Sequence, residues 1–355
     1  MFLRTEPYSL NFYKLRKILL VRTDRIGDTL LTLPVAKPIK ERWPDCKIDF
    51  LARTYTHPIL RNVKEIGQIL NYDPEGVHRG IRGHQLLATE IQQQNYEAAI
   101  LFYPRFGLTS ALWWAGIPRR IGTSHRWYSF LLTDRVHQSR KECLKHEAEY
   151  NLDLLEPLIQ DLPSEIPLFR LAIPEKTKRE LKEILTANDI LGKYIVVHPG
   201  NGDSAPNLSL DQYRTIIQQI SLSGIRVVLT GVNSEKEYNE SLKSDLSTNN
   251  ITDLTGTLNL EQMIALLSEA CGLITTSTGP AHIASSVGTP VATFYCPAIP
   301  HSPDRWGPLE NLERVITPKL ENSHCQMKQC PHGTHGCLAT CLQDDQISKA
   351  LNYLL

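Results

Sequence analysis

The sequence lacks the features that mark several classes of protein. Lys and Arg total 38, as do Asp and Glu, so the net charge is zero and nothing global points to nucleic acid as a partner. No run of about 18 apolar residues predicts a membrane-spanning helix. The N-terminal stretch 1–17 has no continuous apolar core and no small-residue cleavage site, so it is a poor signal peptide. We therefore expect a cytoplasmic protein.

Two local features leave alternatives open. The N-terminal stretch mixes aromatic and basic residues, which suit either a peripheral contact with the inner face of the cytoplasmic membrane or a ragged end packed on the domain.

The eight cysteines are too sparse for a disulfide scaffold. Four of them cluster late, at Cys325, Cys330, Cys337 and Cys341. Their spacing is looser than that of ordinary zinc pairs, so zinc, buried thiols and an oxidised pair all remain possible.

The 355 residues suit two domains of roughly 150–200 residues each. Short runs rich in Ile, Leu and Val alternate with helical patterns, which predicts βαβ units and parallel sheets in an α/β fold. The pattern is interrupted at 161–176, where three prolines make the best linker candidate. The strands before it are expected at 17–22, 47–52, 68–72 and 97–103, with helices at 28–42, 84–94 and 145–160. After it, strands are expected at 194–200, 226–231, 251–254, 272–276 and 290–295, and helices at 209–222, 234–245, 259–270, 279–287 and 344–355.

Ligands of open parallel sheets bind beyond the carboxyl ends of the strands, so the loops there are the candidate sites. After the first strand come Gly27 and Asp28. Asp28 is either the N-cap of the next helix or a base that faces the cleft, kept ionised by the helix dipole. In the second interpretation Gly27 lets the backbone pass close to a ligand. Arg22 and Arg25 crowd the same turn, and arginine suits phosphate or carboxylate groups.

Two loops of the second half suggest a nucleotide site. Gly200, Gly202 and Ala205 match a dinucleotide fingerprint, but three residues separate the motif from the helix cap at Ser209. No acid follows at the required distance, the next being Glu235, so a small polar loop that admits a nucleotide or sugar fits better. The candidate contacts of this loop are His198, Gly200, Asn201, Gly202, Ser204 and Glu235.

The second of these loops, 277–282, joins a strand to a helix that begins after Thr278. Free N–H groups at such a helix end attract phosphate, and the candidate contacts are Ser277, Thr278, Gly279, Pro280 and His282. Taken alone, His282 suits a packed residue better than a ligand contact. In the first half, Arg120 and Arg126 flank a Gly-Thr-Ser turn and form either a solvated basic face or a grip on an acidic acceptor.

The stretches 18–52, 194–202, 253–295 and 304–309 resemble glycosyltransferase family 9, the ADP-heptose:lipopolysaccharide heptosyltransferases. The late Cys-Pro pattern at 330–337 also recurs in that family. The resemblance implies a GT-B fold of two Rossmann-like domains facing across a cleft. Residues 1–165 would bind the acceptor, 175–340 the nucleotide-sugar, and 341–355 would form a C-terminal helix.

The same resemblance implies inverting, metal-independent transfer without a cofactor. Asp28 would be the base, and Thr278, Gly279, Pro280 and His282 would hold the donor diphosphate. The acceptor would be lipopolysaccharide core or another lipid-linked or polysaccharide glycan.

Two departures from the family pattern bear on the donor. The family usually has Asp where this chain has Ser277, and a Lys where this chain has 205–208 without a cation. Without the lysine, the helix end and an arginine of the first domain would have to bind the donor diphosphate. Two other hypotheses therefore stand beside the transferase: a family member that binds a nucleotide-sugar or glycan without turnover, and a nucleotide-sugar epimerase on the same scaffold.

Overall fold

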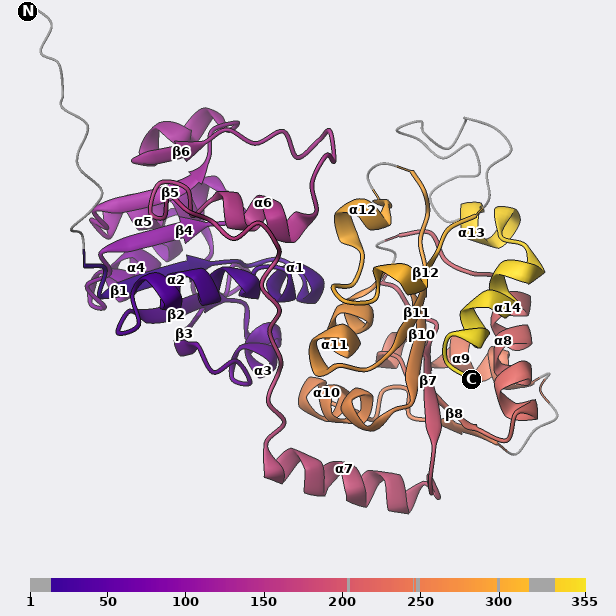
Figure 1. Cartoon of the computed structure of the whole chain (residues 1–355). Coiled ribbons are helices and arrows are strands. Elements are labelled where there is room, and N and C mark those ends of the chain that lie inside the picture. The colour runs from indigo at the N-terminus through magenta and orange to yellow at the C-terminus, as the bar shows by residue number, and fades with distance from the viewer. Residues whose placement is uncertain (1–13, 203–204, 245, 247–249, 299–300, 319–335) are drawn as a thin grey trace, which may run out of the picture.

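The computed structural model describes residues 14–202, 205–244, 246, 250–298, 301–318 and 336–355. They form two lobes, each built on a parallel sheet of six strands with helices on its faces, so the α/β prediction is confirmed (Figure 1). No helix among these residues is long and apolar enough to cross a membrane.

The sheet of the N-terminal lobe has the order β3-β2-β1-β4-β5-β6, in which the chain starts in the middle and builds outward on both sides. Its strands are rich in branched apolar residues and are almost wholly buried at the centre, as expected for a sheet covered on both faces. The strands are β1 (Lys17–Val21), β2 (Lys47–Ala52), β3 (Ile66–Asn71), β4 (Ala98–Leu101), β5 (Arg119–Thr123) and β6 (Asp134–Val136). The helices are α1 (Ile26–Leu30), α2 (Ala36–Arg42), α3 (His57–Leu60), α4 (Gly80–Gln92), α5 (Phe106–Trp114) and α6 (Glu147–Asp153).

The single helix expected over 28–42 is interrupted. α1 ends at Leu30, a 3-10 turn follows at Leu33–Val35, and α2 begins at Ala36. Pro34 lies in the interrupted stretch, and a proline within a helix removes a backbone hydrogen bond and crowds the preceding turn. The break leaves α1 as a short separate element directly after β1.

The sheet of the C-terminal lobe repeats the same order, as β12-β11-β10-β7-β8-β9. Strand order reverses between β7 and β10, which is the switch point where ligands of such sheets bind. The strands are β7 (Tyr194–His198), β8 (Arg226–Leu229), β9 (Ile251–Asp253), β10 (Gly272–Thr276), β11 (Val291–Phe294) and β12 (Val315–Ile316). The helices are α7 (Glu175–Ala187), α8 (Leu210–Leu222), α9 (Lys236–Ser244), α10 (Leu260–Glu269), α11 (Gly279–Val287), α12 (Pro303–Trp306), α13 (Gly336–Cys341) and α14 (Asp344–Asn352).

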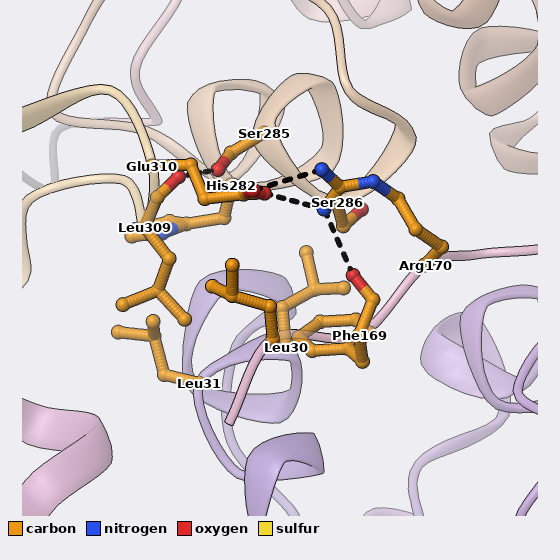
Figure 2. A pocket seen from close by; sticks show the side chains of 10 residues that line it. Leu30, Leu31, Phe169, Arg170, His282, Ser285, Ser286, Leu309 and Glu310 are labelled. Carbon is orange, nitrogen blue, oxygen red and sulfur yellow. Dashed lines mark hydrogen bonds and ion pairs between the residues drawn. The ribbon is translucent and has the colours of Figure 1, made fainter. Parts of the chain in front are cut away.

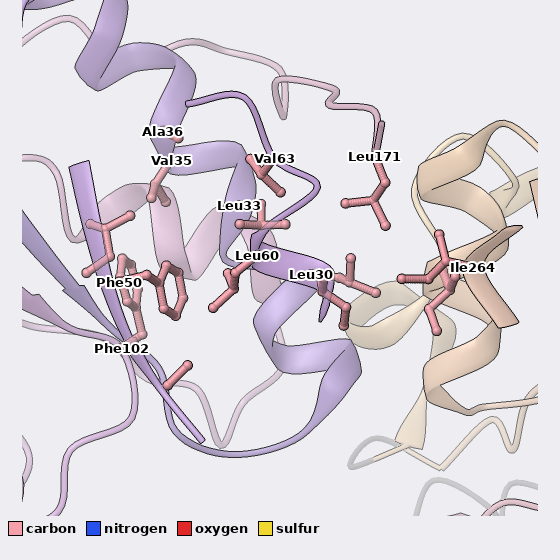
Figure 3. Close-up of a cluster of buried hydrophobic side chains, with 14 of the residues drawn as sticks. Leu30, Leu33, Val35, Ala36, Phe50, Leu60, Val63, Phe102, Leu171 and Ile264 are labelled. Carbon is pink, nitrogen blue, oxygen red and sulfur yellow. The ribbon is translucent and has the colours of Figure 1, made fainter. Parts of the chain in front are cut away.

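The lobes are joined by apolar packing as well as by the chain. α1 packs against α11, and α3 packs against α10. Leu30, Leu171 and Ile264 belong to one buried cluster that continues from the first sheet into the second lobe (Figure 3). Burying each such side chain contributes roughly 1.5–3 kcal/mol, so the junction is a structured contact.

The connecting segment, between α6 and α7, is fixed to both lobes. The Leu171 N–H donates to the carbonyl of Ser286 at 3.1 Å, and the Ala172 N–H donates to that of Asn62 at 2.9 Å. Beside them, Arg170 pairs with Glu310, and Leu30 and Leu31 pack under His282 (Figure 2). The two carboxyl edges of the sheets are thereby held facing each other.

Candidate active site

Asp28 lies in the first turn of α1, directly after β1. Arg25 occupies the N-cap position of this helix, so the interpretation of Asp28 as the cap is wrong. The Asp28 carboxylate accepts a hydrogen bond from Arg22 and lines a pocket between the lobes. Its side chain is 15% exposed, which leaves it open to a ligand in that pocket.

The electrostatic surroundings of Asp28 raise its pKa from 3.8 to about 6. Burial is the largest cause, and the negative charges of Asp24 and Glu147 act in the same direction. Arg22 opposes them but does not cancel them. Asp28 is thus ionised at neutral pH as expected, but burial raises its pKa instead of the helix dipole holding it low. The carboxylate is ionised at neutral pH and about half protonated near pH 6, a value suited to a general base.

The pocket has a volume of about 240 Å³ and is lined by both lobes. Seven of the predicted site residues meet there: Arg25, Gly27, Asp28, Ser277, Thr278, Gly279 and His282. His301 and Trp306, to which the sequence patterns assigned no role, complete the lining. A carboxylate of the first lobe thus faces the start of a helix of the second.

That helix is α11, which begins at the switch point after β10. Its N-cap, Thr278, makes no side-chain capping bond, and its hydroxyl lies 3.1 Å from that of Thr275. Pro280 occupies the first turn, where its missing N–H costs nothing. The N–H groups of a helix start and the helix dipole favour an anion, so this end of the pocket suits a phosphate group.

Gly27 and Gly279 allow α1 and α11 to approach closely. A Cβ on Gly27 would lie 2.8 Å from His282 Cδ2, and one on Gly279 would lie 3.1 Å from Ile26 Cγ2. Gly27 lines the pocket, and its lack of a side chain also makes room for His282 of the other lobe.

His282 packs on Gly27 and also lines the pocket. Burial lowers the pKa of its imidazole to about 3, with a smaller effect from His146, so the ring is neutral. Its Nδ1 is buried and has no hydrogen-bond partner in the described part of the chain. A neutral ring contributes packing and one hydrogen-bond donor but no positive charge to an anion.

The positive charge of the pocket comes from Arg25. Its side chain is exposed and, among the described residues, forms no ion pair. Arg22 differs: it is 2% exposed, and its guanidinium binds Asp28, Asp24 and Glu147. The expectation that Arg22 contacts a substrate is therefore corrected, because it is buried and orients the Asp28 carboxylate.

The loop after β7 lies beside the pocket but does not line it. His198 Nδ1 lies 2.9 Å from Thr230 Oγ1, and burial lowers its pKa to about 4. The Glu235 carboxylate packs over Gly200, where a Cβ would clash with it, and accepts the N–H of Val232 at 2.8 Å. Gly202 has a φ of 54° in the left-handed region. Asn201 Nδ2 donates to the Ala205 carbonyl at 2.6 Å, and Ser204 lies outside the described residues.

The two predicted acceptor arginines have different positions. The Arg120 guanidinium donates to the carbonyls of Ile117 and Leu131, so it holds a strand to a loop and is not available to a substrate. Arg126 is exposed and precedes a 3-10 turn at Trp127–Leu131. Only Arg126 remains a candidate for acceptor binding.

The late cysteine cluster lies largely outside the described residues, so the zinc alternative there stays a prediction. Cys325 and Cys330 lie outside the described residues, as does the side chain of Cys337, and the half-buried Cys341 has a free thiol. In the part of the chain that the structure describes, no group of three or more His, Cys, Asp or Glu residues is placed to hold a metal.

Two facing Rossmann-like lobes with a pocket at their carboxyl edges define a GT-B fold. The match to the family model described as "Glycosyltransferase family 9 (heptosyltransferase)" covers residues 85–335. The chain belongs to glycosyltransferase family 9.

Its relatives agree with this assignment. A Haemophilus influenzae protein described no further than as a glycosyltransferase is 28% identical over 85% of this chain and 88% of its own. Lipopolysaccharide heptosyltransferase 3 of Escherichia coli is 27% identical over 76% of this chain and 79% of its own length. The fold matches the structure of E. coli ADP-heptose lps heptosyltransferase II, with a TM-score of 0.77, 20% identity and coverage of 95% and 98%.

Proposed function

We propose that this enzyme transfers a heptose or a related sugar from ADP-heptose to a lipopolysaccharide core or another cell-surface glycan. One observation carries the proposal: Asp28 lines the same pocket as the first turn of α11, so a base faces an anion site across a space that a sugar can fill. The relatives whose names specify lipopolysaccharide heptosyltransferases support the choice of sugar and acceptor.

The proposed reaction is a single displacement at the anomeric carbon. An acceptor hydroxyl attacks that carbon while Asp28 takes its proton, and the bond to the nucleoside diphosphate breaks with its electron pair. Attack opposite the leaving group inverts the anomeric configuration. The N–H groups at the start of α11 stabilise the charge that develops on the diphosphate.

Arg25 is proposed as the cation of the donor site. The loop at 205–208 has no lysine, and His282 is neutral, so neither supplies positive charge. Arg25 lines the same pocket as Thr278 and Gly279 and forms no ion pair among the described residues. Ser277 stands nearby in place of a carboxylate, and a hydroxyl both donates and accepts hydrogen bonds to sugar hydroxyls. His198, Gly200, Asn201, Gly202 and Glu235 are proposed to border the nucleotide, because they lie at or after the carboxyl ends of β7 and β8 beside the switch point. The contact expected of Ser204 stays a prediction from the sequence.

The acceptor is proposed to lie along an aromatic surface formed by Phe106, Trp127 and Phe130. The rings of Phe106 and Trp127 stack at 5.1 Å, and the three side chains are 49%, 73% and 65% exposed. Arg126 adjoins them in sequence. Aromatic and basic side chains together suit a lipid-linked, acidic acceptor at the inner face of the cytoplasmic membrane. Co-sedimentation with anionic vesicles should fall several-fold in a Trp127→Ser, Phe130→Ser double variant, and unchanged binding would remove the membrane contact from the proposal.

The function is tested in two stages. A thermal-shift panel of ADP-, UDP- and GDP-sugars should show the largest rise in melting temperature with ADP-heptose, because a ligand that binds the folded state stabilises it. Transfer to heptose-deficient lipopolysaccharide should then consume the donor only when acceptor is present. Stabilisation without transfer to any acceptor would favour a binding protein, and an epimer or free nucleotide formed without acceptor would favour the epimerase.

A further inference from the structure

Glu147, the first residue of α6, is the centre of a buried charge network. Its side chain is 1% exposed, and its carboxylate binds three arginines: Arg22 at 3.3 Å, Arg140, and Arg305 at 3.2 Å. The three guanidinium groups hold the pKa of Glu147 below its ordinary value although burial alone would raise it. The single negative charge of Glu147 is thus shared among three guanidinium groups in a buried, poorly hydrated part of the protein.

Arg305 is the member of this network that comes from the C-terminal lobe. It lies in α12, and besides Glu147 it donates to the carbonyl of Arg140 at 3.1 Å. Next to it, the His146 ring binds the Gly307 carbonyl at 2.9 Å, so two consecutive residues of the first lobe contact this turn. These contacts exist only when the two lobes are docked, because each joins residues about 160 positions apart in different lobes.

From Glu147 the network continues to the proposed base. Arg22 reaches Glu147 with Nη1 and Asp28 with Nη2, so a single guanidinium spans both carboxylates. We propose that Arg305 is a positioning residue that completes the environment of Asp28 when the lobes dock, acting through Glu147 and Arg22. The inference rests on the proposed role of Asp28 as the base.

The sign of the effect follows from the charges. Glu147 raises the pKa of Asp28, and Arg305 neutralises part of the Glu147 charge. Removing Arg305 should therefore raise the pKa of Asp28, whereas neutralising Glu147 should lower it. The charged and titratable groups around Asp28 are Arg22, Asp24, Arg25, Tyr55, Glu147, His282 and His301, with Arg140, His146 and Arg305 behind them.

The first test compares pH profiles of kcat/KM for Arg305→Met, Arg305→Lys and Glu147→Gln. The acid limb should move up by about half a pH unit in Arg305→Met and down by a similar amount in Glu147→Gln, with a smaller move in Arg305→Lys. The control is Arg61→Gln, which removes a lobe-to-lobe pair with Glu261 at 3.7 Å that does not touch this network. An equal shift in Arg61→Gln would overturn the inference, as would an unmoved limb in Arg305→Met that is accompanied by an unmoved midpoint in a titration of the Asp28 carboxyl.

A second readout separates this inference from the role of Asp28. The ¹³C signal of the Asp28 carboxyl, assigned by its loss in Asp28→Asn, is titrated in wild type and in Arg305→Met. A raised midpoint that the activity limb follows supports both claims. A raised midpoint with an unmoved limb supports the coupling and contradicts Asp28 as the base. An unmoved midpoint overturns the coupling. Arg305 is partly exposed whereas Glu147 is buried, so Arg305→Met is expected to disturb folding less than Glu147→Gln.

Discussion

Replacing Gly27 with alanine should separate the two lobes at the point where they meet. The new Cβ would lie 2.8 Å from His282 Cδ2, whereas carbon atoms in contact lie about 3.5–4.0 Å apart. His282 is 8% exposed and lies in α11, which is itself packed on α1, so its ring has little freedom to withdraw. Overpacking of this kind costs about 1–3 kcal/mol.

Because the strain falls on the contact between α1 and α11, it should appear in catalysis more than in the folding of either sheet. The expected result is a fall in kcat/KM of about 5- to 150-fold, the equivalent of that free energy. Steady-state transfer assays measure it, and circular dichroism checks that the lobes remain folded.

The double variant Gly27→Ala, His282→Ala identifies the cause. Removing the ring vacates the space that the methyl group needs. The loss of transition-state stabilisation in the double variant should therefore be smaller than the sum of the two single losses by about 1 kcal/mol or more. Additive losses in the double variant, or full activity in Gly27→Ala alone, would refute the role given to this contact.

Three further predictions concern the base, the donor and the fold. With a pKa of about 6 for Asp28, kcat/KM should fall about tenfold between pH 7 and pH 5. If the base had an ordinary carboxyl pKa, kcat/KM would change little over this pH range, so a flat profile would contradict the assignment. Arg25→Gln should raise the donor KM about tenfold with a smaller effect on kcat, and an unchanged KM would remove Arg25 from the donor site. Asp49 is 3% exposed and accepts hydrogen bonds from Tyr96 and the Gln68 N–H, at 2.9 and 2.8 Å. Asp49→Ala should therefore lower the free energy of unfolding in urea by about 2–4 kcal/mol while the folded enzyme keeps its kcat/KM, and loss of activity without loss of stability would contradict this.

The sequence pattern predicts the strands at the centre of each sheet well. β1, β7 and β10 are runs of branched apolar residues that end in polar turns, and such runs have few alternatives to a buried parallel strand. The strands β5 and β6, at one side of the first sheet, escape prediction because they carry arginine and aspartate and alternate little. The break near Pro34 was visible in principle, since proline disfavours a continuous helix.

The site was predictable where it depends on local sequence. Gly27, Asp28, Thr278 and Gly279 stand at the carboxyl ends of central strands, and the topology of parallel sheets brings such positions to one edge. Contacts between lobes were not predictable in this way. The pairing of Glu147 with Arg305 spans 158 positions, and no spacing rule connects them. The DRWGPL stretch at 304–309 contributed to the family resemblance but carried no sign that Arg305 and Trp306 face the other lobe.

The central claim is that Asp28 removes a proton from the acceptor while the donor is held at the start of α11. Its most direct test is a paired measurement on Asp28→Asn, of transfer from ADP-heptose and of ADP-heptose affinity by calorimetry. Asp24→Asn is the matched control, because Asp24 binds the same Arg22 at 2.6 Å but does not line the pocket. Transfer should fall by at least about 100-fold in Asp28→Asn with donor affinity within a few-fold of wild type, and less in Asp24→Asn. Near-normal transfer by Asp28→Asn would contradict the account.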